Sequence, residues 1–222
     1  MSTYSLEKAL EIPNLINEAG NSLIHEATLN NSIKITEFLI DYLESKLTEF
    51  FTKHELDEEE ADINIKLEIK LWINRPARSS EGFTTLHYAS YNGNSKMIKL
   101  LIEKGADPYA VNIEGINMLH VAAQGDQAYS LTYFKEAGID LSETDGENST
   151  PLHWACFSGS DTAIYYLLAW GVNINHQDNL GLTPLHLAVK SLDNFSSLRA
   201  LKELLIKGAN KHIEDGNGFK PI

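Results

Sequence analysis

Five of the eight histidines recur at one position of a repeated motif, and histidine is a common metal ligand and proton-transfer group near neutral pH. The motif Leu-His-x-Ala occurs four times, and its histidines His87, His120, His153 and His186 follow one another in equal steps of 33. His25 stands at the same position of an earlier, less regular copy. Ligands of one metal ion must converge within a few ångström, whereas these rings lie one per repeat. We therefore expect no metal site, and each imidazole should bond the backbone of a neighbouring hairpin or a capping hydroxyl.

The single cysteine offers no other obvious chemistry. Cys156 follows Trp154 and Ala155 on a segment rich in Ala and Leu, where a buried thiol acts as a small hydrophobic side chain. One cysteine forms no intramolecular disulfide, which fits a reducing compartment. No nucleophile, base and orienting group fall together along the chain. We predict no catalytic residue and no cofactor, and the chain is expected not to be an enzyme.

The elements that position these side chains follow from the residues around the motif. Thr150 can cap a helix N-terminus through its hydroxyl, and Pro151 suits the first helical position, where no N–H donor is needed. Gly171 suits a left-handed residue that ends a second helix, and Gly105 and Gly138 precede it by steps of 33. Each repeat should therefore be a helix-turn-helix unit that buries its apolar face only by stacking on its neighbours.

A period of 33 carrying Thr-Pro-Leu-His-x-Ala resembles the ankyrin repeat. This resemblance implies an all-α ankyrin-repeat solenoid of about five repeats plus the start of a sixth. The whole chain, 1–222, is expected to be a single domain. Its parts are an N-terminal cap at 1–18, repeat 1 with a long helical insertion at 19–79, and repeats at 80–112, 113–145, 146–178 and 179–214, followed by a truncated repeat at 215–222.

Two irregularities lie near the end of the chain. Repeat 5 exceeds the period by four, because its closing Gly208 follows Gly171 by 37, and the segment 192–197 is the expected place of an extra turn. The sixth copy stops inside the motif at Ile222. Because solenoids normally end in a polar capping repeat, we expect the sequence to be part of a longer chain.

The insertion in repeat 1 calls for two more helices. The step from His25 to His87 exceeds one period by 29. Apolar residues from 35 to 51 keep helical spacing, which predicts a second helix that continues to about Thr52. Residues 63–73 alternate with period 2, a pattern typical of a strand. A lone strand has no pairing partner in a helical solenoid, so we favour a helix that packs back on the long one.

Composition and charge limit the classes of partner that the chain is expected to bind. The 222 residues include 18 Lys and Arg against 31 Asp and Glu, a formal net charge of −13. Such a surface repels phosphate backbones. We therefore expect no nucleic-acid partner, and a basic or neutral protein or peptide is favoured as the partner. The N-terminus has no signal-peptide pattern, and no apolar stretch has the length of a membrane span. We expect a cytoplasmic monomer that does not itself insert into a membrane.

The resemblance also implies where a partner binds, because inner helices and hairpin tips line the concave face of an ankyrin solenoid. Two positions on each inner helix and several at the tips should face this groove, and exposed aromatic side chains there are typical of peptide sites. The alternative is that Trp154 and Tyr88 only wedge between repeats. The candidate partner-binding residues are Tyr88, Tyr91, Tyr109, Asn112, Gln124, Trp154, Phe157 and Lys190.

A narrower resemblance involves residues 118–127, 149–156 and 166–171, which look like the amino-terminal ankyrin region of DHHC-type protein S-acyltransferases (palmitoyltransferases). It implies a cytosolic arm, on the cytosolic face of a membrane, that recruits proteins for palmitoylation. The catalytic Asp-His-His-Cys motif is not in these residues. In animal relatives a Trp at the place of Trp154 helps to read a short peptide, whereas their second contact, an Asn, corresponds here to Gly125. The alternative is a stand-alone ankyrin adaptor or inhibitor without an associated enzyme.

Overall fold

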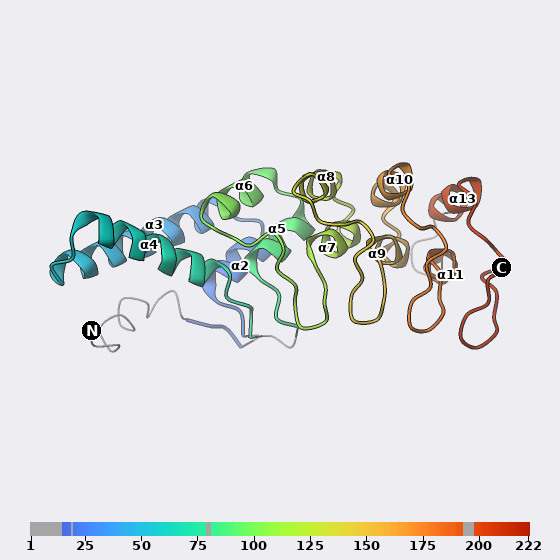
Figure 1. Ribbon diagram of the computed structural model, residues 1–222, viewed down its shortest axis with the longest axis horizontal. Helices are drawn as coiled ribbons and strands as arrows, with labels where there is room; N and C mark the ends of the chain where they lie inside the picture. The colour runs from blue at the N-terminus through green and yellow to red at the C-terminus, as the bar shows by residue number, and fades with distance from the viewer. Residues whose placement is uncertain (1–14, 19, 79–80, 193–197) are drawn as a thin grey trace. The chain divides into compact units, whose positions relative to one another are not determined.

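The computed structural model describes residues 15–18, 20–78, 81–192 and 198–222, which form helices joined by turns and loops (Figure 1). Within these ranges Ile16 and Ser22 form an isolated antiparallel bridge, and there is no longer strand. The predicted all-α repeat fold is confirmed. The described helices are α2 (Leu23–Leu29), α3 (Ile33–Lys53), α4 (Glu58–Ile73), α5 (Thr85–Asn92), α6 (Ser95–Glu103), α7 (Met118–Gln124), α8 (Ala128–Glu136), α9 (Pro151–Ser158), α10 (Asp161–Ala169), α11 (Pro184–Lys190) and α13 (Arg199–Ile206).

Backbone proximity divides the chain into two compact units, and each is described by itself. The first comprises Met1–Ala89 and Asn94–Pro108, and the second comprises Ser90–Gly93 and Tyr109–Ile222. The expected single domain and its repeat boundaries stay predictions. Most of the predicted N-terminal cap and most of the extra turn of repeat 5 lie outside the described residues. None of the helices in the described ranges has the length and hydropathy needed to span a bilayer.

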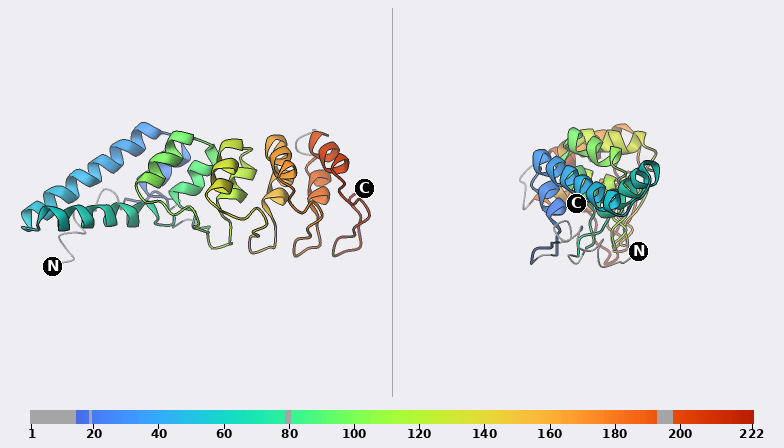
Figure 2. Two further views of the ribbon diagram at one scale, coloured as in Figure 1. Left: turned by 45° about the horizontal axis from the view of Figure 1, so that its top comes forward. Right: turned by 90° about the vertical axis from the view of Figure 1, so that its left-hand side faces the viewer.

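In the first unit, α3 and α4 form a long antiparallel pair (Figure 2). α3 ends at Lys53, which confirms the long helix predicted to reach about Thr52. α4 confirms that residues 63–73 are helical. The Asp57 carboxylate caps α4 by accepting a hydrogen bond from the Glu60 N–H at 2.8 Å. Three glutamates in the first turn also stabilise the helix, because their negative charges lie at the positive end of the helix dipole.

The second unit is a stack of helical hairpins. Figure 1 shows α7, α9 and α11 in one row, α8, α10 and α13 in a second row, and the connecting loops projecting on the side of the first row. Neighbouring helices within each row contact one another. The motif leucines Leu119, Leu152 and Leu185 are at most 1% exposed. The stacking of inner helices therefore buries the part of each repeat that no single hairpin could cover.

Each motif histidine of the second unit links two repeats. In α9 the backbone N–H of Thr150 donates to Nδ1 of His153 at 3.2 Å, so the proton of the ring lies on Nε2. Nε2 then donates to the carbonyl oxygen of Leu182 at 3.1 Å, at the entrance to the next repeat. His120 and His186 make the same pair of contacts. The predicted structural role of the histidines is confirmed at these positions.

The loops beside the inner helices are joined to the loops of neighbouring repeats by backbone hydrogen bonds. The Gly146 N–H donates to the Glu114 carbonyl oxygen at 2.6 Å, and the Gly216 N–H donates to the Leu180 carbonyl oxygen at 2.8 Å. Gly181 adopts a φ of 74°, and a Cβ on it would lie 2.6 Å from the nitrogen of Gly216. A glycine is needed there because neighbouring loops approach so closely. These contacts hold the loop side chains at fixed positions beside the helices.

Candidate functional site

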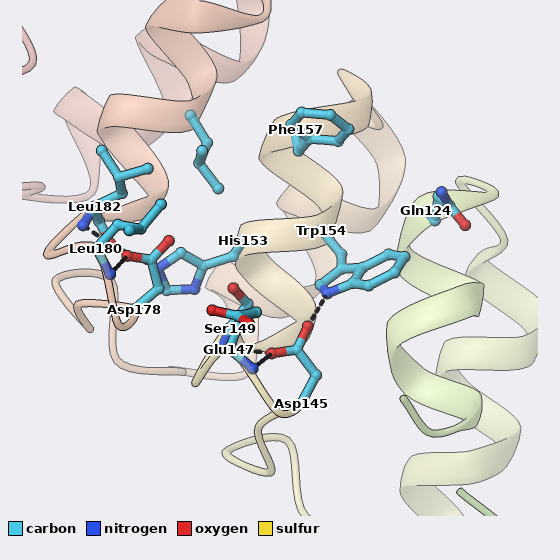
Figure 3. A pocket seen from close by; sticks show the side chains of 11 residues that line it. Gln124, Asp145, Glu147, Ser149, His153, Trp154, Phe157, Asp178, Leu180 and Leu182 are labelled. Atoms are coloured by element: carbon cyan, nitrogen blue, oxygen red, sulfur yellow. Dashed lines mark hydrogen bonds between the residues drawn. The ribbon is translucent and has the colours of Figure 1, made fainter. Parts of the chain in front are cut away.

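A pocket of about 450 Å³ opens beside α9 in the second unit (Figure 3). Its walls come from α7, α9 and α11 and from the two loops that precede α9 and α11. The helices contribute aromatic and aliphatic side chains, and the loops contribute carboxylates together with two leucines. The lining residues are Gln124, Asp145, Glu147, Ser149, His153, Trp154, Phe157, Asp178, Leu180, Leu182 and Leu187.

Trp154 is held in one orientation. Its indole Nε1 donates to Oδ2 of Asp145 at 2.8 Å. The other oxygen of Asp145 accepts the backbone N–H groups of Glu147 at 3.0 Å and Ser149 at 2.8 Å. One carboxylate therefore shapes the loop and orients the indole, which makes a T-shaped contact with the ring of His120 at a centroid distance of 6.1 Å. The indole is half-buried, so it packs on the repeat below and still lines the pocket.

Phe157 lies one turn further along α9 and is 61% exposed. An i, i+3 spacing brings it to the same helical face as Trp154. Figure 3 shows both rings on this face, with Gln124 of α7 beyond the indole. An aromatic ring that is mostly in solvent contributes little to folding, so its place beside a pocket favours a role in binding.

The pocket carries negative charge. Asp145, Glu147 and Asp178 contribute carboxylates, and the lining set contains no lysine or arginine. Asp178 repeats the loop role of Asp145, because its Oδ1 accepts the N–H groups of Leu180 at 2.9 Å and Leu182 at 2.8 Å. A carboxylate lining next to apolar side chains favours ligands that combine positive charge with apolar surface.

Neither the pocket histidine His153 nor the cysteine of α9, Cys156, is available as a reactive group. His153 uses both ring nitrogens in structural hydrogen bonds, and burial lowers its pKa, which keeps the ring neutral. Cys156 is fully buried, and burial raises the pKa of its thiol, which disfavours the nucleophilic thiolate. Across the ranges that the structure describes, no group of three or more metal-ligating side chains converges on a point.

The structure brings three of the sequence-predicted partner residues together, namely Gln124, Trp154 and Phe157. Lys190 and Tyr91 are exposed side chains of the second unit outside the pocket lining. The binding role of these five candidates stays a prediction.

The remaining three candidates have structural contacts. Tyr88 belongs to the first unit, where it is half-buried and its ring lies 6.1 Å from that of His25. The Tyr109 hydroxyl donates to the Ala137 carbonyl oxygen at 2.6 Å, although 59% of the residue is exposed. Asn112 is only 6% exposed, and its Oδ1 shapes a turn by accepting two backbone N–H groups. We leave Asn112 out of the proposed surface because a buried side chain is not accessible to a partner.

Sequence reasoning missed Asp178, Leu180 and Leu182 as pocket residues. A signal was present, because Asp178 follows Asp145 by the same step that separates the motif histidines. Leu180 is 64% exposed at a loop tip, where a large apolar side chain is unusual enough to indicate a contact surface.

Comparison with known families agrees with this architecture. A family model described as ankyrin repeats (3 copies) matches residues 4–112, 55–145 and 119–215. Together these matches extend from 4 to 215 of the 222 residues. No curated protein matches the chain.

Proposed function

This chain belongs to the ankyrin-repeat family, and from that premise we propose that the pocket beside α9 binds an extended segment of a partner protein. Ankyrin repeats are general protein–protein interaction modules, and repeat proteins use their long concave surfaces for binding. The proposed partner-facing residues are those of the pocket, with Trp154 and Phe157 at its centre.

The observation that carries the proposal is the fixed indole next to the exposed phenyl ring. Aromatic side chains dominate the binding energy of many interfaces. A side chain that is already held in its binding orientation loses less conformational entropy on association. The hydrogen bond between Trp154 and Asp145 holds the indole in this way before any partner arrives.

The dimensions of the pocket fit a short peptide segment. Its volume of about 450 Å³ lies within the range of about 300 to 1,000 Å³ for ligand pockets. Such a space accommodates a few side chains of an extended chain, with the rest of the partner lying along neighbouring loops.

The test uses peptides selected from a random linear library against the full chain. Calorimetric titration would compare wild-type protein with Trp154→Ala and Phe157→Ala. We expect each variant to weaken binding at least about tenfold, the loss typical of a central aromatic contact.

Tyr165→Ala is the matched control, because Tyr165 on α10 is 58% exposed and lies outside the pocket lining. It should bind like wild type. Circular dichroism would verify that all three variants remain folded. Selected peptides that bind both pocket variants at wild-type affinity would refute the proposal.

The finer assignment concerns the parent protein. On the sequence resemblance alone, we propose that the module is the substrate-recruiting arm of a DHHC-type protein S-acyltransferase, working as a monomer at the cytosolic face of a membrane. The alternative is a stand-alone cytoplasmic adaptor or inhibitor. Sequencing the transcript beyond the codon for Ile222 separates the two: an Asp-His-His-Cys segment between apolar spans supports the first, and a stop codon supports the second.

A further inference from the structure

The loops before α9 and α11 carry the same aspartate with different neighbours. Asp145 and Asp178 stand at equivalent positions of successive repeats, and each uses Oδ1 to accept two N–H groups of its own loop. The helix residue nine positions later is Trp154 in the first case and Leu187 in the second. Oδ2 of Asp145 accepts the indole N–H of Trp154, whereas a leucine side chain has no donor to offer.

Oδ2 of Asp178 therefore lacks the partner that its counterpart has. Within the described ranges of the chain, no side chain or backbone group donates to this oxygen. In Figure 3 the carboxylate of Asp178 lies on the wall of the pocket beside Leu180, Leu182 and His153. The nearby His153 is no competitor for it, because both ring nitrogens are engaged elsewhere.

We propose that the partner segment supplies an arginine whose guanidinium donates to Oδ2 of Asp178, in the place that the indole of Trp154 occupies one repeat earlier. This inference rests on the proposed function, since it names the side chain that enters the same pocket. Leu187 and Phe157 then cover the apolar stem of the arginine, and the exposed carboxylate of Glu147 adds attraction from the neighbouring loop.

Three properties of the pocket favour a guanidinium over other groups. The surroundings are anionic, within a chain of net charge −13, so an acidic side chain is repelled. The wall beside Asp178 is apolar, and a guanidinium sheds its water more readily than an ammonium group does. A planar group with N–H donors at its edge also copies the indole of Trp154, which satisfies the equivalent oxygen.

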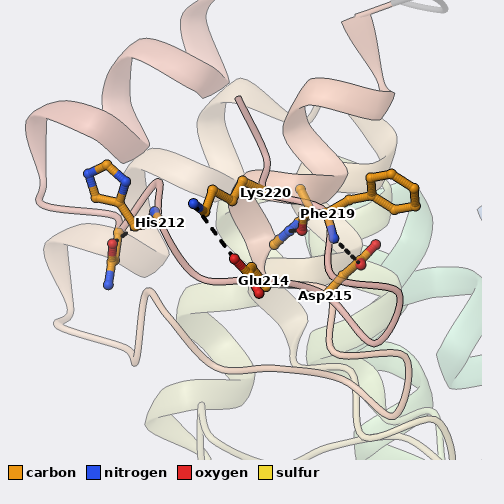
Figure 4. A network of polar contacts seen from close by, with 7 residues as sticks. His212, Glu214, Asp215, Phe219 and Lys220 are labelled. Atoms are coloured by element: carbon orange, nitrogen blue, oxygen red, sulfur yellow. Dashed lines mark hydrogen bonds and ion pairs between the residues drawn. The ribbon is translucent and has the colours of Figure 1, made fainter.

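The test replaces Asp178 in the full chain without disturbing its loop. Asn is tolerated at this loop position, because Asn112 forms the corresponding turn through its Oδ1 with N–H groups two and four residues later. Asp178→Asn should therefore keep the turn and remove the negative charge. Asp215→Asn is the matched control, because Asp215 holds the next loop in the same way and lies outside the pocket (Figure 4).

The probes are library-selected peptides and their synthetic versions in which arginine is replaced by lysine or by citrulline, its neutral isostere. We expect arginine to be enriched in the selection, and wild-type protein to prefer arginine over citrulline by about tenfold or more, typical of a charge-assisted hydrogen bond. The preference should fall to about twofold in Asp178→Asn and persist in Asp215→Asn.

Each other result overturns the assignment. The assignment would be contradicted by a selection without arginine, by equal affinity for the arginine and citrulline peptides, by equal affinity for the lysine peptide, or by an unchanged preference in Asp178→Asn. The proposed function would survive these results as long as Trp154→Ala and Phe157→Ala still weaken binding. Loss of that dependence would instead remove the proposed function itself.

Discussion

The carboxylate of Asp145 both stabilises a loop and orients a side chain of the pocket. One oxygen of its carboxylate shapes a loop, and the other orients the indole of Trp154. Asp145 lies in a loop and Trp154 on a helix nine residues later, and this separation along the chain concealed their contact. The pairing depends on how far the loop folds back along α9, which no local pattern specifies.

We predict that Asp145→Asn removes the hydrogen bond that holds the indole of Trp154. An asparagine has one side-chain oxygen, which can serve the loop N–H groups or the indole N–H but not both. The stability of the second unit should fall by about 1.5–3 kcal/mol, typical of a lost hydrogen bond to a charged group. The indole N–H of Trp154, observed by NMR, should exchange faster with solvent. Unchanged exchange in the variant would contradict the described contact.

The buried histidines predict a dependence of stability on pH. Burial lowers the pKa of His120 to about 4, well below the ordinary histidine value of about 6.5. Between these values the unfolded chain binds the proton more strongly than the folded one, so acid favours unfolding. The stabilisation is complete above about pH 6.5 and is lost as the pH falls toward 4.

The free energy of unfolding of the second unit, measured with urea, should therefore be about 2 kcal/mol lower at pH 5 than at pH 7 from the contribution of His120 alone. His153, whose pKa burial also lowers, adds in the same direction. An NMR titration of the His120 ring checks the cause directly. Equal unfolding free energies at the two pH values, or a ring that titrates near pH 6.5, would show that the histidine is not buried and neutral.

Among the helices, α4 has a sequence whose alternation of apolar and polar residues is typical of a strand. Apolar residues at every second position fall on two opposite faces of a helix, because each step of two turns the chain by about 200°. Ile65 and Ile69 are at most 8% exposed, whereas Ile63, Leu67 and Leu71 are 49–59% exposed. The pattern alone favoured a strand, and the absence of a pairing partner correctly favoured a helix.

The two faces of α4 should respond differently to truncation. Ile69→Ala removes a side chain that is 3% exposed, and we expect it to cost about 2–4 kcal/mol. Leu67→Ala removes one that is 49% exposed, and it should cost less than about 1 kcal/mol. Chemical denaturation followed by circular dichroism measures both. Similar losses for the two variants would mean that the outer face of α4 is also packed.

Across the molecule, the helices were predictable from the sequence, whereas the contacts between loops of neighbouring repeats were not. The constant step of the histidines and the closing glycines identified the hairpins from Thr85 onward. The length of α3 followed from helical spacing. The pocket was only partly predictable, because Asp178 and Leu180 reach it through contacts between loops of neighbouring repeats. Such contacts are set by stacking geometry.

Stacking also predicts how a defect spreads. Leu152 in α9 is 1% exposed, and Leu152→Ala should cost about 2–5 kcal/mol. In a repeat array each hairpin is stabilised by its neighbours, so hydrogen exchange should accelerate in α9 and in α7 and α11, which contact it. The amides of α3 and α4 in the first unit should change little. Uniform acceleration through every helix would indicate a single cooperative unit.

We propose that the face of α9 with Trp154 and Phe157 contacts a partner polypeptide, and site-specific photo-crosslinking tests this contact most directly. A photoreactive phenylalanine analogue would replace Phe157 in one protein and Tyr165, which is similarly exposed on α10, in another. Both would be irradiated with a peptide selected on the wild-type chain. The account predicts crosslinking from position 157 and none from position 165, and crosslinking from 165 alone would contradict it.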